Sequence, residues 1–268
     1  MHFNDEFKGK SVIVTGAAGG IGKETALRFA AAGAKVAVCD VKTSQGKQTA
    51  EEITESGGTG FFEELDVTDS KAAGRMAEKT AERFGGIDVL VNCAGISGFG
   101  LRNISKTEDQ EWDITYQVNL KGTANCCRAV YGYFREQKHG KIINVSSAAG
   151  RMPTPGMTPY AASKAAVLNL TRSLASEMAG YNVNVNAVCP GWIWTPIYSE
   201  SGPFQQYAEK LGSTPREVFM GMVKRFCPLQ REQTEEDITN AILFLASKAS
   251  KNITGQAINV DGGAVMHG

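Results

Sequence analysis

The chain has no excess of either charge, because its 28 lysine and arginine residues are matched by 28 aspartate and glutamate residues. This balance gives no basic stripe for nucleic acid and no acidic tail of the kind found in disordered arms. Histidine is scarce, since only His2, His139 and His267 occur and they are scattered along the chain. We therefore expect no nucleic-acid partner and no metal site.

Long apolar runs and export signals are also missing. No apolar segment reaches the length that spans a bilayer, and residues 1–6 (MHFNDE) lack the basic-then-apolar order of a signal peptide. The six cysteines include no C-x-x-C pair. These absences lead us to expect reduced thiols, a cytoplasmic location and no membrane association.

Strand-like and helix-like patterns alternate along the whole chain. Strands are expected at residues 11–15, 35–39, 60–65, 88–91, 141–145, 182–188 and 256–260. Helices are expected at residues 20–32, 43–56, 70–84, 107–136, 159–178 and 234–246, the last with Thr234 as its N-cap. Such repeated units predict an α/β fold, a Rossmann-like doubly wound parallel sheet of about seven strands with helices on both faces.

No linker or internal repeat divides the chain, so we expect one domain over residues 1–268 that serves both dinucleotide binding and catalysis. The connection at residues 192–233 is unusually long for a compact domain. Connections of that length are usually functional, so we expect a substrate-binding lid within the domain.

A glycine-rich turn, Thr15-Gly16-Ala17-Ala18-Gly19-Gly20-Ile21-Gly22, joins the first predicted strand to the first helix. Backbone N–H groups at such a helix start can hold a pyrophosphate. Gly16 would permit the tight turn, Gly20 the approach of backbone to phosphate, and Gly22 the packing of helix on sheet. The spacing is G-x-x-x-G-x-G and not the general G-x-G-x-x-G, so a glycine-rich loop without a ligand is the alternative.

Asp40 ends the second predicted strand, close to the offset at which an acid binds the ribose 2′-hydroxyl of NAD. In that place its charge would repel a 2′-phosphate by up to about 4 kcal/mol and so favour NAD over NADP. The alternative is a surface aspartate that begins a turn.

Tyr160-x-x-x-Lys164, with Ser147 upstream, is typical of a general acid–base site. Positions four apart on a helix share a face, so the phenol and the ammonium group lie side by side. A nearby cation favours the phenolate and lowers the tyrosine pKa. The Ser147 hydroxyl would hold a substrate oxygen against the phenol. By itself the spacing also fits an ordinary surface helix.

Four features combine into one set: Thr15-Gly16-x-x-x-Gly20-Ile21-Gly22, Asn92-x-Ala94-Gly95, Ser147 with Tyr160-x-x-x-Lys164, and Pro190-Gly191-x-x-x-Thr195. Together they resemble the single-domain short-chain dehydrogenases/reductases, over about Phe7 to Gly263. The resemblance implies cofactor contacts from the glycine turn, Ile21 included, and from Tyr160 and Lys164.

The resemblance also assigns residues that patterns alone leave open. It implies that Asp66, beside Val67, contacts the adenine, and that Asn92, Ala94 and Gly95 line the cofactor. Cys93 stands where the family commonly has a second asparagine.

Asn119 would support a water chain to Lys164, and Pro190, Gly191, Ile193 and Thr195 would form the loop that holds the nicotinamide carboxamide. A homotetramer, with helices 107–136 and 159–178 paired between subunits, is implied as well.

The predicted function is an NAD-dependent oxidoreductase that interconverts a secondary alcohol and a ketone with a Ser-Tyr-Lys-Asn site. The alternatives are an NADP-dependent carbonyl reductase, which Asp40 disfavours, and a catalytically silent nucleotide-binding regulator, which the intact Tyr160 and Lys164 disfavour. A lyase or epimerase would need a longer substrate domain. The aromatic lid predicts a partly apolar pocket, although its side chains can equally pack the lid. Arg151 would either bind a substrate carboxylate or cap a loop.

Overall fold

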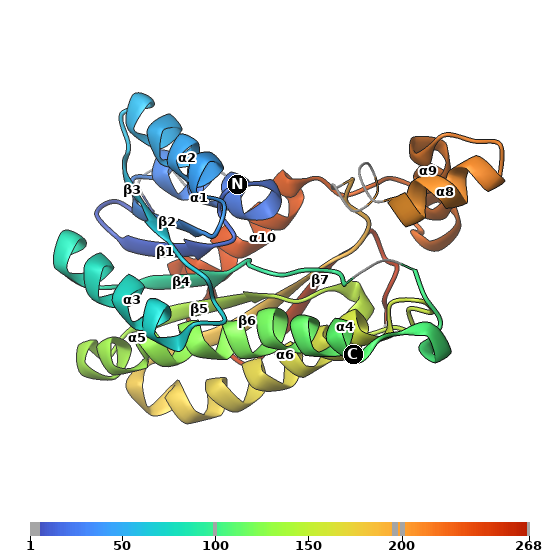
Figure 1. Cartoon of the computed structure of the whole chain (residues 1–268). Coiled ribbons are helices and arrows are strands. Elements are labelled where there is room, and N and C mark those ends of the chain that lie inside the picture. Colours follow the sequence, from blue (N-terminus) through green and yellow to red (C-terminus); the bar gives the residue numbers. More distant parts are fainter. Residues whose placement is uncertain (1–5, 99–100, 195–197, 199–201, 267–268) are drawn as a thin grey trace.

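A seven-stranded sheet forms the centre of the molecule. The computed structural model describes residues 6–98, 101–194, 198 and 202–266. The strands are β1 (Ser11–Thr15), β2 (Lys35–Asp40), β3 (Thr59–Glu64), β4 (Val89–Asn92), β5 (Gly140–Val145), β6 (Val183–Pro190) and β7 (Ala257–Val260). They are all parallel, in the order β3-β2-β1-β4-β5-β6-β7 (Figure 1). The predicted doubly wound parallel sheet is confirmed.

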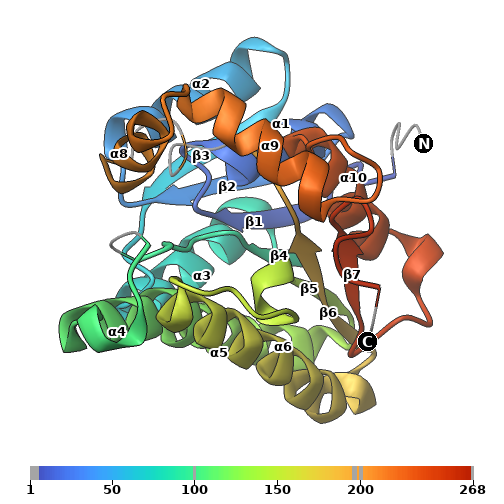
Figure 2. The same ribbon diagram turned by 90° about the vertical axis from the view of Figure 1, so that its right-hand side faces the viewer.

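Helices cover both faces of this sheet. The α-helices are α1 (Gly20–Ala31), α2 (Thr43–Glu55), α3 (Ser70–Phe84), α4 (Asp109–Thr115), α5 (Thr123–Gln137), α6 (Thr158–Met178), α8 (Gly202–Lys210), α9 (Pro215–Phe226) and α10 (Glu235–Ala246). Short 3₁₀ segments occur at η1 (Ile104–Lys106), η3 (Ala148–Gly150), η4 (Ala179–Tyr181) and η5 (Lys248–Ser250). Figures 1 and 2 place α1, α2 and α10 on one face and α3, α5 and α6 on the other.

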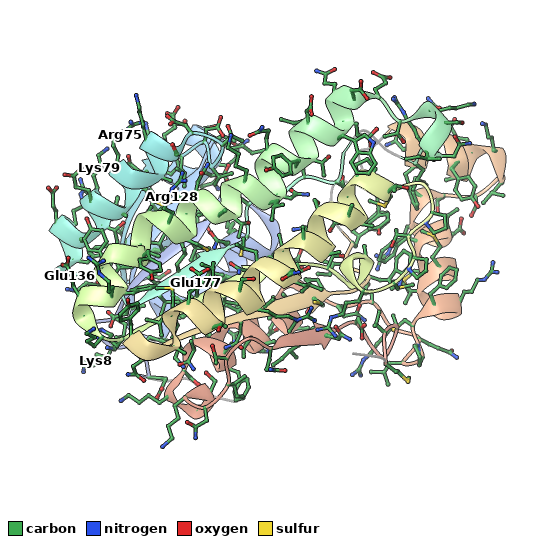
Figure 3. The ribbon with its side chains drawn as sticks, turned by 90° about the horizontal axis from the view of Figure 1, so that it is seen from below. Lys8, Arg75, Lys79, Arg128, Glu136 and Glu177 are labelled. Atoms are coloured by element: carbon green, nitrogen blue, oxygen red, sulfur yellow. The ribbon has the colours of Figure 1, made fainter. Side chains whose placement is uncertain are left out.

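Alternation along the strands explains the two cores. Successive strand side chains point to opposite faces, so Val12 and Val14 pack with Phe29 of α1, whereas Ile13 packs with Met76 of α3. Because both faces are covered, the central strands are continuously apolar. The outward side of the layer formed by α3, α5 and α6 carries charged side chains, among them Arg75 and Arg128 (Figure 3). No described helix combines the length and apolar character needed to cross a membrane.

The long helical stretch predicted at about residues 107–136 is present, but it is not α-helical throughout. It begins at Asp109, and between α4 and α5 it widens into a π-helical segment, η2 (Tyr116–Gly122). The cause lies in tertiary contacts, because the Asn119 amide bonds to Ile96 and Ser163 and Gly122 packs where a Cβ would lie 2.5 Å from Val67 Cγ2. Insertions of this type are common at functional sites.

The connection at 192–233 contains two helices, α8 and α9, which the sequence analysis did not predict. A Thr214–Glu217 capping box and Pro215 in the first turn mark the start of α9, a signal readable from the sequence. Thr234 caps α10, as predicted, with Asp237 completing its capping box. In Figure 1, α8 and α9 lie beyond the end of the sheet to which β6 leads.

Candidate active site

The carboxyl ends of β1 and β4 meet at the point where the strand order reverses, which is where ligands bind in open α/β sheets. The two turns are in close contact. Ala94 N–H donates to Thr15 Oγ1 at 3.2 Å, and a Cβ on Gly16 would lie 2.7 Å from Ala94 N. Gly16 also has φ +66°, so both its conformation and its neighbour require glycine.

The start of α1 fits an anion. Gly20 has φ +51°, and an added Cβ there would meet nothing within 4 Å, so its backbone faces open space. No side chain caps this helix start, so its first N–H groups are available to a phosphate. A Cβ on Gly22 would lie 2.1 Å from Gly16 O. Gly22 therefore lets the helix pack on the turn's own backbone, which differs from the predicted packing on the sheet.

Asp40 lies next to the glycine turn at the end of β2. Its Oδ2 accepts from Ala18 N–H at 3.0 Å and its Oδ1 from Lys42 N–H at 2.9 Å. These two bonds fix a half-buried carboxylate beside the turn. The carboxylate lies beside the glycine turn, where the sequence analysis expects a ribose contact. Its bond from Lys42 N–H is also typical of an aspartate that begins a turn, which is the alternative considered there.

The segment after β3 continues the same edge. Asp66 is exposed, and its Oδ1 accepts from Thr68 N–H and Thr68 Oγ1 at 2.8 Å each. Asn125 of α5 donates to Val67 O at 2.8 Å and so anchors this segment to the helix. Asp66 and Val67 are thereby held at the outer end of the candidate cofactor site.

Asn92 lies inside the sheet and not at its surface. Its Nδ2 donates to Asn144 Oδ1 at 2.9 Å, and Asn144 donates to Thr171 Oγ1 at 2.9 Å. These two hydrogen bonds link β4, β5 and α6. Burial raises the pKa of the neighbouring Cys93 to about 12. Cys93, which stands where the family commonly has an asparagine, is therefore a neutral thiol.

Tyr160, Lys164 and Ser147 come together at the end of β5. Ser147 caps η3, where its Oγ accepts from Ala149 N–H at 3.1 Å. Tyr160 and Lys164 lie in the first two turns of α6, and Lys164 Nζ is 5.8 Å from the centre of the Tyr160 ring. Lys164 is only 5% exposed and donates to Val145 O at 2.9 Å.

The electrostatics of this group differ from the expectation. The pKa of Tyr160 is raised, because loss of hydration outweighs the hydrogen bond with Ser147 that lowers it. Burial lowers the pKa of Lys164 to about 8. The chain alone therefore does not lower the tyrosine pKa, because burial of the phenol itself disfavours the phenolate.

Asn119 is 1% exposed and its amide is fully engaged. Its Oδ1 accepts from Ile96 N–H at 2.8 Å, and its Nδ2 donates to Ile96 O at 2.8 Å and Ser163 Oγ at 2.9 Å. Ser163 Oγ in turn donates to Tyr160 O at 2.7 Å. The side chain thus holds the 95–96 turn and the start of α6 together, a role that the sequence analysis missed along with Ser163.

The turn after β6 closes the site. Gly191 N–H donates to Val260 O at 3.0 Å, and Ile193 is 5% exposed and pairs with Gln233. Thr195, predicted to contact the nicotinamide, lies outside the described residues. Arg151 donates to Ala257 O at 2.8 Å, which corresponds to the loop-capping alternative.

The lid side chains largely pack on one another. Phe204, Phe219, Val223 and Cys227 are buried, with Trp192, Trp194 and Tyr198 packed against them. Tyr198 also interacts electrostatically with Tyr160, which places the lid cluster near the candidate base. Much of the predicted apolar pocket lining therefore serves as a small core of the lid.

Comparison with known proteins identifies the family. A family model described as "Enoyl-(Acyl carrier protein) reductase" matches residues 16–265. The chain is 40% identical over 259 residues to a 3-oxoacyl-(acyl-carrier-protein) reductase from Thermotoga maritima, covering 97% of this chain and 99% of the relative.

Solved structures agree with this match. The sorbitol-6-phosphate 2-dehydrogenase of Erwinia amylovora superposes with a TM-score of 0.88 at 32% identity, covering 96% of this chain and all of that one. A levodione reductase superposes with a TM-score of 0.90 at 29% identity, covering 97% of this chain and 100% of that one. The chain belongs to the short-chain dehydrogenase/reductase family of oxidoreductases, whose members bind a nicotinamide cofactor and act on CH–OH groups of small molecules.

Proposed function

We propose that this protein is an NAD-dependent dehydrogenase that interconverts a secondary alcohol and a ketone. The observation that carries the proposal is the convergence of Tyr160, Lys164 and Ser147 at the sheet edge where the glycine turn offers its free N–H groups. A bound nicotinamide would accept or donate the hydride and, when oxidised, would add positive charge beside the phenol. The single domain with its lid at 192–233 is part of this proposal.

Tyr160 is the proposed acid–base residue. In oxidation its phenolate oxygen takes the proton of the alcohol hydroxyl as the C–H hydride departs, and in reduction it returns that proton to the carbonyl oxygen. Ser147 donates a hydrogen bond to the same substrate oxygen and stabilises its changing charge. Lys164 supplies positive charge beneath the phenol and a donor for the ribose. Asn119, through Ile96 and Ser163, positions these groups.

NAD is the proposed cofactor because two backbone N–H groups hold the Asp40 carboxylate beside the glycine turn, where the ribose would lie. A 2′-phosphate would meet a fixed carboxylate there. The alternative of an NADP-dependent carbonyl reductase requires a cation at this position, and the residues Ala17, Ala18 and Val41 beside the turn provide none.

A homotetramer in the cytosol completes the proposal. The helical stretch expected to pair between subunits leaves Trp112 36% exposed and Tyr116 51% exposed. Aromatic side chains exposed on adjacent helical segments favour association with another apolar surface. All six cysteines are free thiols, in keeping with a reducing compartment.

We expect NAD to bind at least about 100-fold more tightly than NADP, because a partly screened charge pair near 4 Å costs a few kcal/mol. Asp40→Asn should reduce that ratio by at least about tenfold while preserving the size of the side chain. Fluorescence titration with NADH and NADPH measures both constants. Glu64→Gln is the matched control, because Glu64 is the register partner of Asp40 on β3. Equal binding of both cofactors by the wild type would contradict the NAD assignment.

Tyr160→Phe should lower turnover by at least about 100-fold and leave NADH affinity unchanged, since only the proton-transfer hydroxyl is removed. Absorbance of reduced nicotinamide across a panel of secondary alcohols and ketones measures the rate. Tyr131→Phe is the control, because Tyr131 lies on α5 against Tyr181. Near-normal turnover in Tyr160→Phe would exclude the proposed mechanism.

Lys164→Met should make the protein more stable than the wild type at pH 7, by up to roughly 3 kcal/mol, because the folded-state pKa is about 8 against 10.5 for the free side chain. Between those values the unfolded state binds more protons than the folded state. The unfolding free energy of the wild type therefore rises with pH across this window, and the advantage of the variant shrinks.

Urea unfolding of both proteins at pH 7 and pH 10 measures this difference. Lys47→Met, at an exposed position of α2, should show no comparable pH dependence. A difference between Lys164→Met and the wild type that stays constant with pH would show that burial of the ammonium group carries no stability cost.

Light scattering should give a mass near four times the 28.7 kDa of one chain. Tyr116→Glu should shift the mass toward smaller species, because a charge would then lie in the subunit interface. Tyr207→Glu, at a 46% exposed position of α8, should leave the mass unchanged. A monomeric wild type would rule out the tetramer.

A further inference from the structure

Gln233, where the lid rejoins the fold, holds both backbone polar groups of Trp192. The Gln233 Oε1 accepts from Trp192 N–H at 2.7 Å, and Gln233 N–H donates to Trp192 O at 2.8 Å. The side chain is 6% exposed. Trp192 immediately precedes Ile193 in the turn after β6, so one buried residue determines where that turn lies.

The other half of the Gln233 amide is also engaged. Its Nε2 donates to Arg231 O at 2.9 Å and contacts Cys227 Sγ at 3.7 Å. Cys227 Sγ lies 3.4 Å from Gly262 O, in the turn after β7. With all of its polar atoms committed, the Gln233 side chain has one orientation, and an amide flip would leave two of these contacts mismatched.

Three segments meet here, and we name them the lid-base junction: residues 190–193, 227–233 and 261–263. At two of its glycines there is no space for a methyl group. A Cβ on Gly191 would lie 2.6 Å from both Gln233 Oε1 and Asp261 Cα, and one on Gly262 would lie 2.2 Å from Cys227 Sγ. Asp261 is buried and accepts from Gly263 and Val265 N–H at 2.9 Å each. The junction is therefore closely packed around Gly191, Gly262 and Asp261.

The junction also connects to the lid. The Trp192 ring stacks on Phe226 of α9 with centres 6.0 Å apart and meets Phe219 edge-on at 6.3 Å. Gln233 fixes the backbone of the same residue. Trp192 therefore connects α9, through its ring, to the 190–193 turn, through its backbone.

We propose that Gln233 is a positioning residue that fixes the 190–193 turn against the nicotinamide half of the cofactor and ties that turn to the lid. The inference rests on the proposed function, since it requires a dinucleotide across the carboxyl edge of the sheet. Gln233 touches neither cofactor nor substrate and acts through the Trp192 backbone. Loss of its acceptor would leave Trp192 N–H buried without a partner and would free the turn to move.

Comparison of two ligands separates this role from a general loss of structure. NADH occupies both halves of the proposed cofactor site, whereas ADP-ribose lacks the nicotinamide. Gln233→Leu should weaken NADH binding by about tenfold, the cost of one buried hydrogen bond to a peptide group. ADP-ribose affinity should change less than twofold. Gln233→Glu keeps an oxygen facing Trp192 N–H but turns its second oxygen toward Arg231 O, so it should recover part of the NADH affinity lost in Gln233→Leu.

Gln137→Leu is the matched control. Gln137 also bonds backbone groups through both halves of its side-chain amide, accepting from Ile87 N–H at 3.3 Å and donating to Ile87 O at 2.7 Å, just before the amino end of β4. Gln137→Leu should change neither the NADH affinity nor the ADP-ribose affinity. All constants are measured by calorimetry on the full-length protein.

The outcomes separate the two proposals. A wild type that binds neither ligand would overturn the proposed function and this inference with it. A wild type that binds both, with Gln233→Leu unchanged toward NADH, would overturn only the role of Gln233. Equal losses of NADH and ADP-ribose affinity in both Gln233 variants would also overturn it, because they would indicate a structural role alone.

Discussion

An ammonium group buried without a carboxylate beside it is the constraint around which the candidate site is built. Lys164 is 5% exposed, and among the described residues no acid forms an ion pair with it. A carboxylate would stabilise the charge but would also cancel the field that the lysine exerts on Tyr160. The fold instead offers the peptide oxygen of Val145 and the space left by Gly95, where a Cβ would lie 3.2 Å from Nζ. Positive potential at the phenol is thus maintained at the expense of stability, as is common at functional sites.

Tyr160 is the residue on which this positive potential would act. Since neither the chain nor burial lowers the pKa of Tyr160, the positive charge of an oxidised nicotinamide would be the missing contribution. In the proposed mechanism, proton transfer would therefore depend on the bound cofactor, because its ring charge would favour the phenolate. The neutral Cys93 thiol is compatible with this arrangement, since a thiolate there would oppose it.

Much of the fold and of the candidate site could be predicted from the sequence, because the signals lie in short stretches of the chain. The apolar strands, the glycine turn and the Tyr160–Lys164 spacing are encoded in contiguous residues, so periodicity and motif reveal them. The parallel sheet and the helices that cover it were therefore predictable, whereas α8 and α9 were not predicted, and Tyr160, Lys164 and Ser147 do meet. What could not be predicted depends on contacts between distant segments. The π-helical turn at Asn119 exists because its amide reaches Ile96 and Ser163, 23 and 44 residues away. No window of sequence contains that information.

The lid also contains both kinds of feature, those encoded in neighbouring residues and those that depend on contacts between distant segments. The start of α9 could have been predicted from Thr214, Pro215 and Glu217, whereas the partner of Gln233 could not. Its bond to Trp192 spans 41 residues and requires the lid to fold back on its own start. Phe219 and Val223 thus belong to a hydrophobic core that is separate from the two cores of the sheet. Relatives named for an acyl-carrier-protein substrate, a sugar phosphate and levodione share this framework. Under the proposed function, substrate choice would depend on the lid of this chain, while its lid-base junction would position the nicotinamide.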